Sequence, residues 1–87
     1  MVIKFFGHFE KLAEKEVRIG LKEPISTQEM LQMLASRYPG FARYSAKRND
    51  VELSAHVMLI RQGAPLKLAD RIEDKDRIDI LLPVTGG

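Results

Sequence analysis

One amphipathic helix, with strand-like segments on both sides of it, limits the folds open to this sequence. Ser26 and Glu29 have the spacing of a capping box, in which the serine oxygen accepts a backbone N–H and the glutamate reaches back to the cap residue. Apolar residues follow at helical spacing: Met30, Leu31, Leu34, Ala35 and Tyr38. Because Pro39 disfavours helical geometry in the residue before it, we expect the helix to end near Tyr38.

The flanking segments have the composition and alternation of β-strands. Residues 2–6 are β-branched and aromatic apart from Lys4, and residues 16–22 alternate strictly between apolar and other residues. Residues 56–62 indicate a buried strand, which Gly63-Ala64-Pro65 turns into a hairpin. A polar turn at residues 73–76 leads into a last strand, residues 77–82, with Ile78, Ile80 and Leu82 on one face.

Two segments are less regular. Residues 8–15 fit either one helical turn or a long hairpin loop, and the spacing of their apolar residues does not decide between these. Residues 39–54 are polar, and we expect a mobile, irregular excursion with Phe41 and Tyr44 as anchors on the core and an exposed turn at residues 47–50.

These elements predict a single α+β domain over residues 1–87. A chain of 87 residues is too short for two hydrophobic cores. The economical packing places the helix across one face of a mixed sheet of about five strands. The first and last strands are both strongly apolar, which fits two parallel neighbours at the centre of the sheet.

Composition excludes several classes of function. The chain has no cysteine, and therefore no disulfide, thiolate metal site or cysteine nucleophile of its own, which fits a reducing cytosol. No stretch approaches the roughly 20 apolar residues of a membrane span, so we expect a cytoplasmic protein that is neither exported nor embedded in a membrane. The formal net charge is +2 with both signs interleaved, which argues only weakly for nucleic acid.

The interior of the chain offers no active-site motif. Its two histidines, His8 and His56, stand far apart without cysteine, so we expect no metal site. Asp74, Asp76 and Asp79 are interleaved with basic residues and lack the glycine and distal glutamate of a calcium loop, and we interpret them as turn formers.

The C-terminus is different, because Gly86 and Gly87 follow closely on a core strand. Two residues without side chains can thread a slot that any Cβ would block. We expect residues 83–87 to form a flexible tail, which reaches about 17 Å when extended. An enzyme with MgATP could adenylate the Gly87 carboxylate and make it an acyl donor to sulfide, persulfide or amine. The plainer interpretation is a frayed terminus that happens to contain glycines.

Residues 74–87, DKDRIDILLPVTGG, resemble the C-terminal region of the β-grasp, ubiquitin-like sulfur carriers, most of all the small subunit of molybdopterin synthase. That family has an Asp-x-Asp turn, the final strand and an apolar-Pro-Pro-Val-small-Gly-Gly tail. Here Leu82 stands at the first proline, Arg77 replaces an acidic residue and Thr85 takes the small position. The thiamine-pathway carrier, which usually lacks the long middle excursion and the Pro-Val pair, is the second choice.

The resemblance implies a sulfur-transfer cycle in which the chain is a co-substrate and not an enzyme. An E1-like adenylyltransferase would activate Gly87 with ATP, and a sulfurtransferase would convert it to a thiocarboxylate. The larger catalytic subunit of molybdopterin synthase would then accept the tail. The carrier itself would bind no cofactor. The residues expected to contact these partners are Pro83, Val84, Thr85, Gly86 and Leu81.

Leu81 has two interpretations, since it points away from Ile78 and Ile80. In the first, Leu81 joins Phe6 or Val2 in an exposed apolar patch to which partners bind. In the second, it lies beneath the middle excursion.

Two other classes of function stay open from the sequence. A ubiquitin-like modifier would use the same tail and the same activation, but would be joined through Gly87 to lysines of its targets. A β-grasp interaction or RNA-binding module would carry the tail only incidentally, so its binding would survive removal of Gly86 and Gly87.

Overall fold

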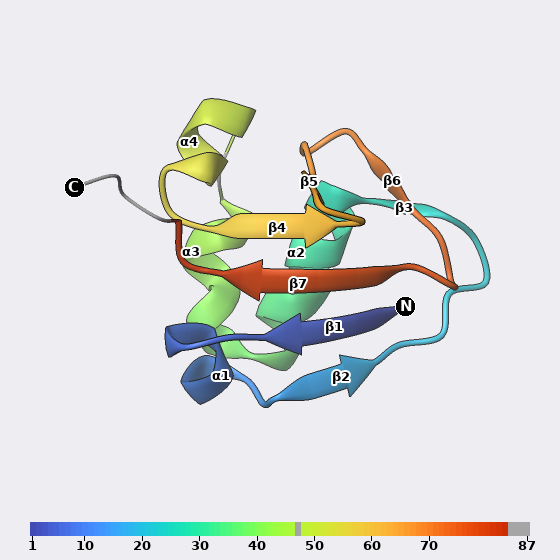
Figure 1. Ribbon diagram of the computed structural model, residues 1–87, viewed down its shortest axis with the longest axis horizontal. Coiled ribbons are helices and arrows are strands. Elements are labelled where there is room, and N and C mark those ends of the chain that lie inside the picture. The colour runs from blue at the N-terminus through green and yellow to red at the C-terminus, as the bar shows by residue number, and fades with distance from the viewer. Residues whose placement is uncertain (47, 84–87) are drawn as a thin grey trace.

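A mixed five-stranded sheet forms the front layer of the molecule, and the main helices lie behind it (Figure 1). This computed structural model describes residues 1–46 and 48–83. The strands follow the order β2-β1-β7-β4-β5. Their bounds are β1 Val2–Phe5, β2 Glu16–Arg18, β4 Met58–Arg61, β5 Ala64–Pro65 and β7 Arg77–Leu81. The expected α+β architecture is confirmed.

The first and last strands lie side by side and parallel at the centre of the sheet, as predicted. Ile3 of β1 stands beside Ile78 of β7, and Phe5 stands beside Ile80. All four side chains are buried, at most 2% exposed. Alternate residues point to opposite faces of a strand, so the sheet has one face covered by helices and one that we call the open face.

Helix α2 (Thr27–Arg37) covers the centre of the sheet and begins with the predicted capping box. The Glu29 N–H donates to Ser26 Oγ at 3.1 Å, and the Ser26 N–H donates to Glu29 Oε1 at 3.1 Å. Met30, Leu31 and Leu34 are completely buried. The helix ends where Pro39 predicts, with Tyr38 at its C-cap in extended geometry.

A second, two-stranded sheet holds the N-terminus of α2 and was not predicted. Its strands, β3 (Ile25–Ser26) and β6 (Arg71–Ile72), pair antiparallel. The buried Thr27 is bound to the same segment, because its N–H donates to the Asp70 carbonyl at 2.9 Å. Strands of two residues are too short for a periodic pattern, which explains why sequence analysis missed them.

Two predicted strands were too long by several residues, and those at residues 2–6 and 77–82 were each too long by one. The alternating segment 16–22 pairs only as far as Arg18, and its later apolar residues Ile19 and Leu21 are half-buried against the core. The segment 56–62 pairs only over Met58–Arg61, and His56 lies exposed in a turn. The apolar pattern in these segments therefore includes residues that contact the core but no longer pair with a neighbouring strand.

The hairpin after β4 is confirmed, with its turn one residue earlier than expected. Arg61 pairs with Ala64, so Gln62 and Gly63 form the loop. Both have positive φ, 52° and 78°, as a two-residue hairpin loop of type I′ requires.

The less regular segments are more helical than expected. Residues 8–15 take the helical alternative as α1 (His8–Leu12). The prediction of an irregular excursion over residues 39–54 was wrong, since it contains η1 (Pro39–Phe41), α3 (Ala42–Ser45) and α4 (Asp50–Ser54). The two aromatic anchors were correct: Phe41 and Tyr44 are buried, with ring centroids 5.6 Å apart.

Candidate functional site

The predicted site residues cluster at the end of β7. Leu81 is the last residue of that strand, and Pro83 is the last residue that the structure describes. Val84, Thr85, Gly86 and Gly87 lie outside the described residues. We call Leu81–Pro83 the tail exit, because the chain leaves the sheet there towards Gly87.

Leu81 lies on the open face at the tail exit. It pairs with Met58 of β4, and the register of Phe5 beside Ile80 brings Phe6 alongside it. The Phe6 N–H donates to the Ile80 carbonyl at 3.0 Å, which fixes this register. We call Phe6, Met58 and Leu81 the exit patch. Phe6 is 44% exposed, so the patch presents a large apolar side chain to solvent.

The structure corrects two predictions about the residues around Leu81. Val2 pairs with Arg77 at the far end of the two strands, so Phe6, not Val2, accompanies Leu81. Leu82, expected on the buried face with Ile78 and Ile80, is 49% exposed. The reason is that β7 ends at Leu81, and beyond it the chain no longer follows the pleat.

A second apolar surface adjoins the tail exit on the side of strands β4 and β5. A groove of about 340 Å³ runs between α4 and the β4–β5 hairpin. We call it the α4 groove, and its lining residues are Asp50, Leu53, Ser54, Val57, Met58, Leu59, Pro65, Leu66 and Pro83. Figure 1 shows α4 beside the start of β4 and the end of β7.

The α4 groove was not predicted, because residues 39–54 were expected to be irregular. A signal was present: Asn49 and Glu52 have the same three-residue spacing as Ser26 and Glu29. In the structure Asn49 caps α4, and its Oδ1 accepts the Glu52 N–H at 2.8 Å.

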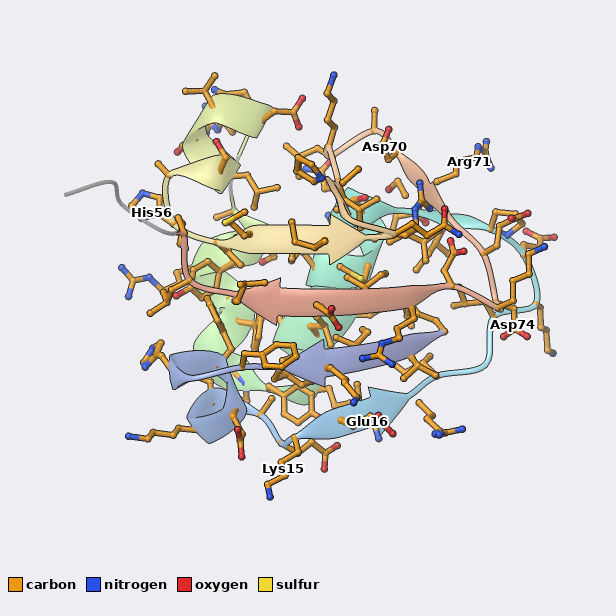
Figure 2. The ribbon with its side chains drawn as sticks, in the orientation of Figure 1. Lys15, Glu16, His56, Asp70, Arg71 and Asp74 are labelled. Carbon is orange, nitrogen blue, oxygen red and sulfur yellow. The ribbon has the colours of Figure 1, made fainter. Side chains whose placement is uncertain are left out.

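Asp74 and Asp76 lie in the turn before β7, at the opposite end of the sheet, but the interpretation of Asp79 as a turn former was wrong, because it pairs within β7. Figure 2 shows Asp74 at the end remote from His56, and His56 lies near the tail exit. The Asp74 carboxylate accepts the Leu21 N–H at 2.7 Å and lies 3.6 Å from the Met1 ammonium. The Leu21 hydrogen bond first, and then the ammonium charge, lower the pKa of Asp74. Asp74 therefore ties the N-terminus to the turn.

The open face between these two ends is polar. Lys4 of β1 stands beside Asp79 of β7 in the register. Asp79 Oδ1 lies 3.7 Å from Arg77 Nε and accepts no hydrogen bond among the described residues. The exit patch is therefore an apolar area at one end of a charged surface.

The described residues contain neither a metal cluster nor a spanning helix. Over residues 1–46 and 48–83, no group of three or more His, Cys, Asp or Glu side chains could hold a metal ion. In the same ranges, no helix has the length and apolar content needed to cross a bilayer.

Comparison with known proteins gives one family match and several similar folds. A family model described as the ThiS family matches residues 3–87. No curated protein sequence matches the chain.

Among solved structures, SAMP1 from Haloferax volcanii is 24% identical with a TM-score of 0.74, and the match covers 99% of this chain and 97% of that one. A Pyrococcus furiosus protein assigned as molybdopterin converting factor, subunit 1, is 20% identical with a TM-score of 0.75, covering 95% of both chains. The Haloferax volcanii HVO 2177 protein is 23% identical with a TM-score of 0.76, covering 99% of this chain and 84% of that one. These likenesses establish a ubiquitin-like β-grasp fold.

Proposed function

The chain belongs to the ThiS family, and from this premise we propose that it is a sulfur carrier whose Gly87 carboxylate is adenylated and then converted to a thiocarboxylate. The observation that carries the proposal is the position of Gly86 and Gly87, which follow the central strand of a β-grasp sheet within six residues of its end. A free carboxylate behind two residues without side chains suits an active site that closes around the chain.

The proposed chemistry takes place on the tail and needs a partner enzyme. The Gly87 carboxylate attacks the α-phosphorus of MgATP, and pyrophosphate leaves. Sulfide then attacks the acyl carbon, AMP leaves, and the carboxyl group has exchanged one oxygen for sulfur. Binding of the tail in a fixed position makes both attacks effectively intramolecular.

The sheet provides a rigid base for this tail. β7 pairs with β1 on one side and with β4 on the other, and its Ile78 and Ile80 are completely buried. Gly87 stands four residues beyond Pro83, so it can reach at most about 13 Å from that residue. An enzyme that acts on Gly87 must therefore cover the tail exit, where the exit patch supplies apolar contact area.

We assign the chain no catalytic side chain and no bound cofactor. Phe6, Met58 and Leu81, which surround the tail exit on the open face, can bind a partner but cannot transfer protons or sulfur. The proposed partners are an E1-like adenylyltransferase that uses ATP, a sulfurtransferase, and the larger catalytic subunit of molybdopterin synthase. We place this chemistry in the cytoplasm.

For the sulfur acceptor we propose a pterin precursor in the synthesis of the molybdenum or tungsten cofactor. The support is the resemblance of residues 74–87 to the molybdopterin synthase small subunit and the long middle segment, residues 39–54. A thiazole precursor in the thiamine pathway is the alternative within the same class. Reconstitution with each acceptor enzyme in turn distinguishes the two.

The decisive experiment is the intact mass of the protein after incubation with MgATP, its adenylyltransferase and sulfide. Replacement of one oxygen by sulfur, localised to Gly87 by fragmentation, supports the carrier. An unchanged mass with a demonstrably active enzyme contradicts it. A ladder of high-mass conjugates under denaturing conditions would instead support a protein modifier.

A further inference from the structure

Three of the four large apolar side chains that are exposed among the described residues lie at the tail exit or on α4, and the fourth, Met33, is on α2. Within residues 1–46 and 48–83, the large hydrophobic side chains that are exposed are Phe6, Met33, Val51 and Leu82. Phe6 belongs to the exit patch and Leu82 to the tail exit itself. Val51, 81% exposed, is on α4 and lines a shallow hollow that shares Asp50, Ser54, Pro65 and Leu66 with the α4 groove. Such a concentration on a small protein marks an interaction surface.

The α4 groove has a rigid, apolar floor. Leu53, Val57, Leu59 and Leu66 are at most 7% exposed and line it from α4, from the residue before β4, from β4 and from the segment after β5. The Leu66 N–H donates to the Leu59 carbonyl at 2.7 Å, which holds that segment against β4.

The two walls of the groove are also linked. The Asp50 carboxylate at the start of α4 accepts the Leu68 N–H at 2.7 Å. The Asp50 charge is therefore used within the fold, and an occupant of the groove meets mainly apolar surface. A preformed site of this kind costs little ordering entropy when a partner binds.

The length of the tail limits how far from the groove a partner that takes Gly87 can lie. Pro83 lines the α4 groove, and Gly87 is four residues further on. A protein whose active site takes Gly87 therefore comes within about 13 Å of Pro83, which lines the groove and lies next to the exit patch.

From this geometry, and resting on the proposed function, we infer that the α4 groove is a second docking surface for the enzyme that activates Gly87, and that it takes an apolar side chain of that enzyme. The activating enzyme is the occupant because both the carrier and the modifier require the same activation step. An enzyme that contacts both the exit patch and the α4 groove cannot rotate about a single contact. The tail therefore enters its active site in one orientation.

A matched pair of substitutions on neighbouring residues tests this. Ser54 is exposed and lines the groove, whereas Ala55 is exposed and does not. Ser54→Arg puts a long charged side chain at the groove, and Ala55→Arg adds the same side chain beside it. The measurement is the dissociation constant for the adenylyltransferase encoded in the same genome, together with the rate of ATP-dependent adenylation of Gly87 and the melting temperature of each variant.

We expect Ser54→Arg to weaken binding about tenfold or more and Ala55→Arg to change it less than about twofold, with all melting temperatures alike. Equal binding by wild type and both variants overturns the inference that the α4 groove is a docking surface, and it leaves the proposed function intact. A wild-type protein that is not activated at all overturns both. If Ser54→Arg lowers the melting temperature, Pro65→Arg replaces it, because Pro65 is exposed and lines the same groove.

Discussion

Asp76 holds the turn that leads into β7. Its Oδ2 accepts the Glu73 N–H at 2.9 Å and lies 2.9 Å from Arg61 Nη1, with the aspartate side chain only 12% exposed. Burial by itself would raise the pKa of Asp76, but the Glu73 hydrogen bond and the Arg61 guanidinium outweigh it and lower the pKa below the ordinary 3.8. The ionised form of Asp76 therefore stabilises the folded protein.

The lowered pKa of Asp76 predicts that the folded protein loses stability in acid. A carboxyl group whose folded pKa is depressed contributes stability above its unfolded pKa, here 3.8, and loses it as the pH falls through the folded value. We expect Asp76→Asn to lower the free energy of unfolding at pH 7 by about 1–3 kcal/mol, and the difference from wild type to shrink below about pH 4. Urea titrations over a pH series measure this.

Glu23→Gln is the control, because it removes an exposed carboxylate for which the structure shows no side-chain hydrogen bond or ion pair among the residues it describes. A difference between Asp76→Asn and wild type that stays constant down to pH 2 would contradict the assigned role of the Asp76 charge.

Gly87 is the residue on which the proposed chemistry depends. We expect Gly87→Ala to impair adenylation by about tenfold or more while leaving the melting temperature unchanged, because an enzyme slot that fits glycine must exclude an added methyl group. Pyrophosphate release with MgATP and the adenylyltransferase measures the effect. Adenylation at the wild-type rate would show that the slot does not select for glycine.

At the scale of elements, α2 depends on its capping box. Ser26 satisfies one N–H of the first turn and Glu29 satisfies the N–H of Ser26 in return. We expect Ser26→Ala to destabilise the protein by about 1 kcal/mol, measured by urea unfolding. Ser36→Ala, an exposed position inside the same helix, should have little effect. Equal losses at the two positions would contradict a specific role of the cap, because alanine has the higher helix propensity and propensity alone predicts no loss at Ser36.

At the scale of the whole molecule, folding and the proposed function separate along the chain. The buried core residues that the structure describes extend from Met1 to Ile80. Deletion of Val84–Gly87 should therefore leave the melting temperature and the circular dichroism spectrum unchanged and abolish activation completely. An added residue after Gly87 should also prevent activation, because it moves the carboxylate out of register. A truncated protein that still binds its partners and supports their activity would favour an interaction module.

Local and periodic features of the fold could be predicted from the sequence. The Ser26–Glu29 capping box, the end of α2 before Pro39 and the Gly63 hairpin depend on residues close together in the chain. The parallel pairing of β1 and β7 is a long-range feature, yet it was predictable because both segments are too apolar for a sheet edge.

The sequence by itself determined the helix, the central strands, the β-grasp class and the glycines on which the proposed chemistry rests, since these follow from spacing, composition and family resemblance. Only the tertiary structure decided where pairing stops, and hence that Leu82 is exposed and that Phe6 accompanies Leu81. It also decided that α4 and the β4–β5 hairpin enclose a groove beside Pro83. The physical reason is that strand ends, two-residue strands and grooves depend on contacts between distant segments, which no local pattern records.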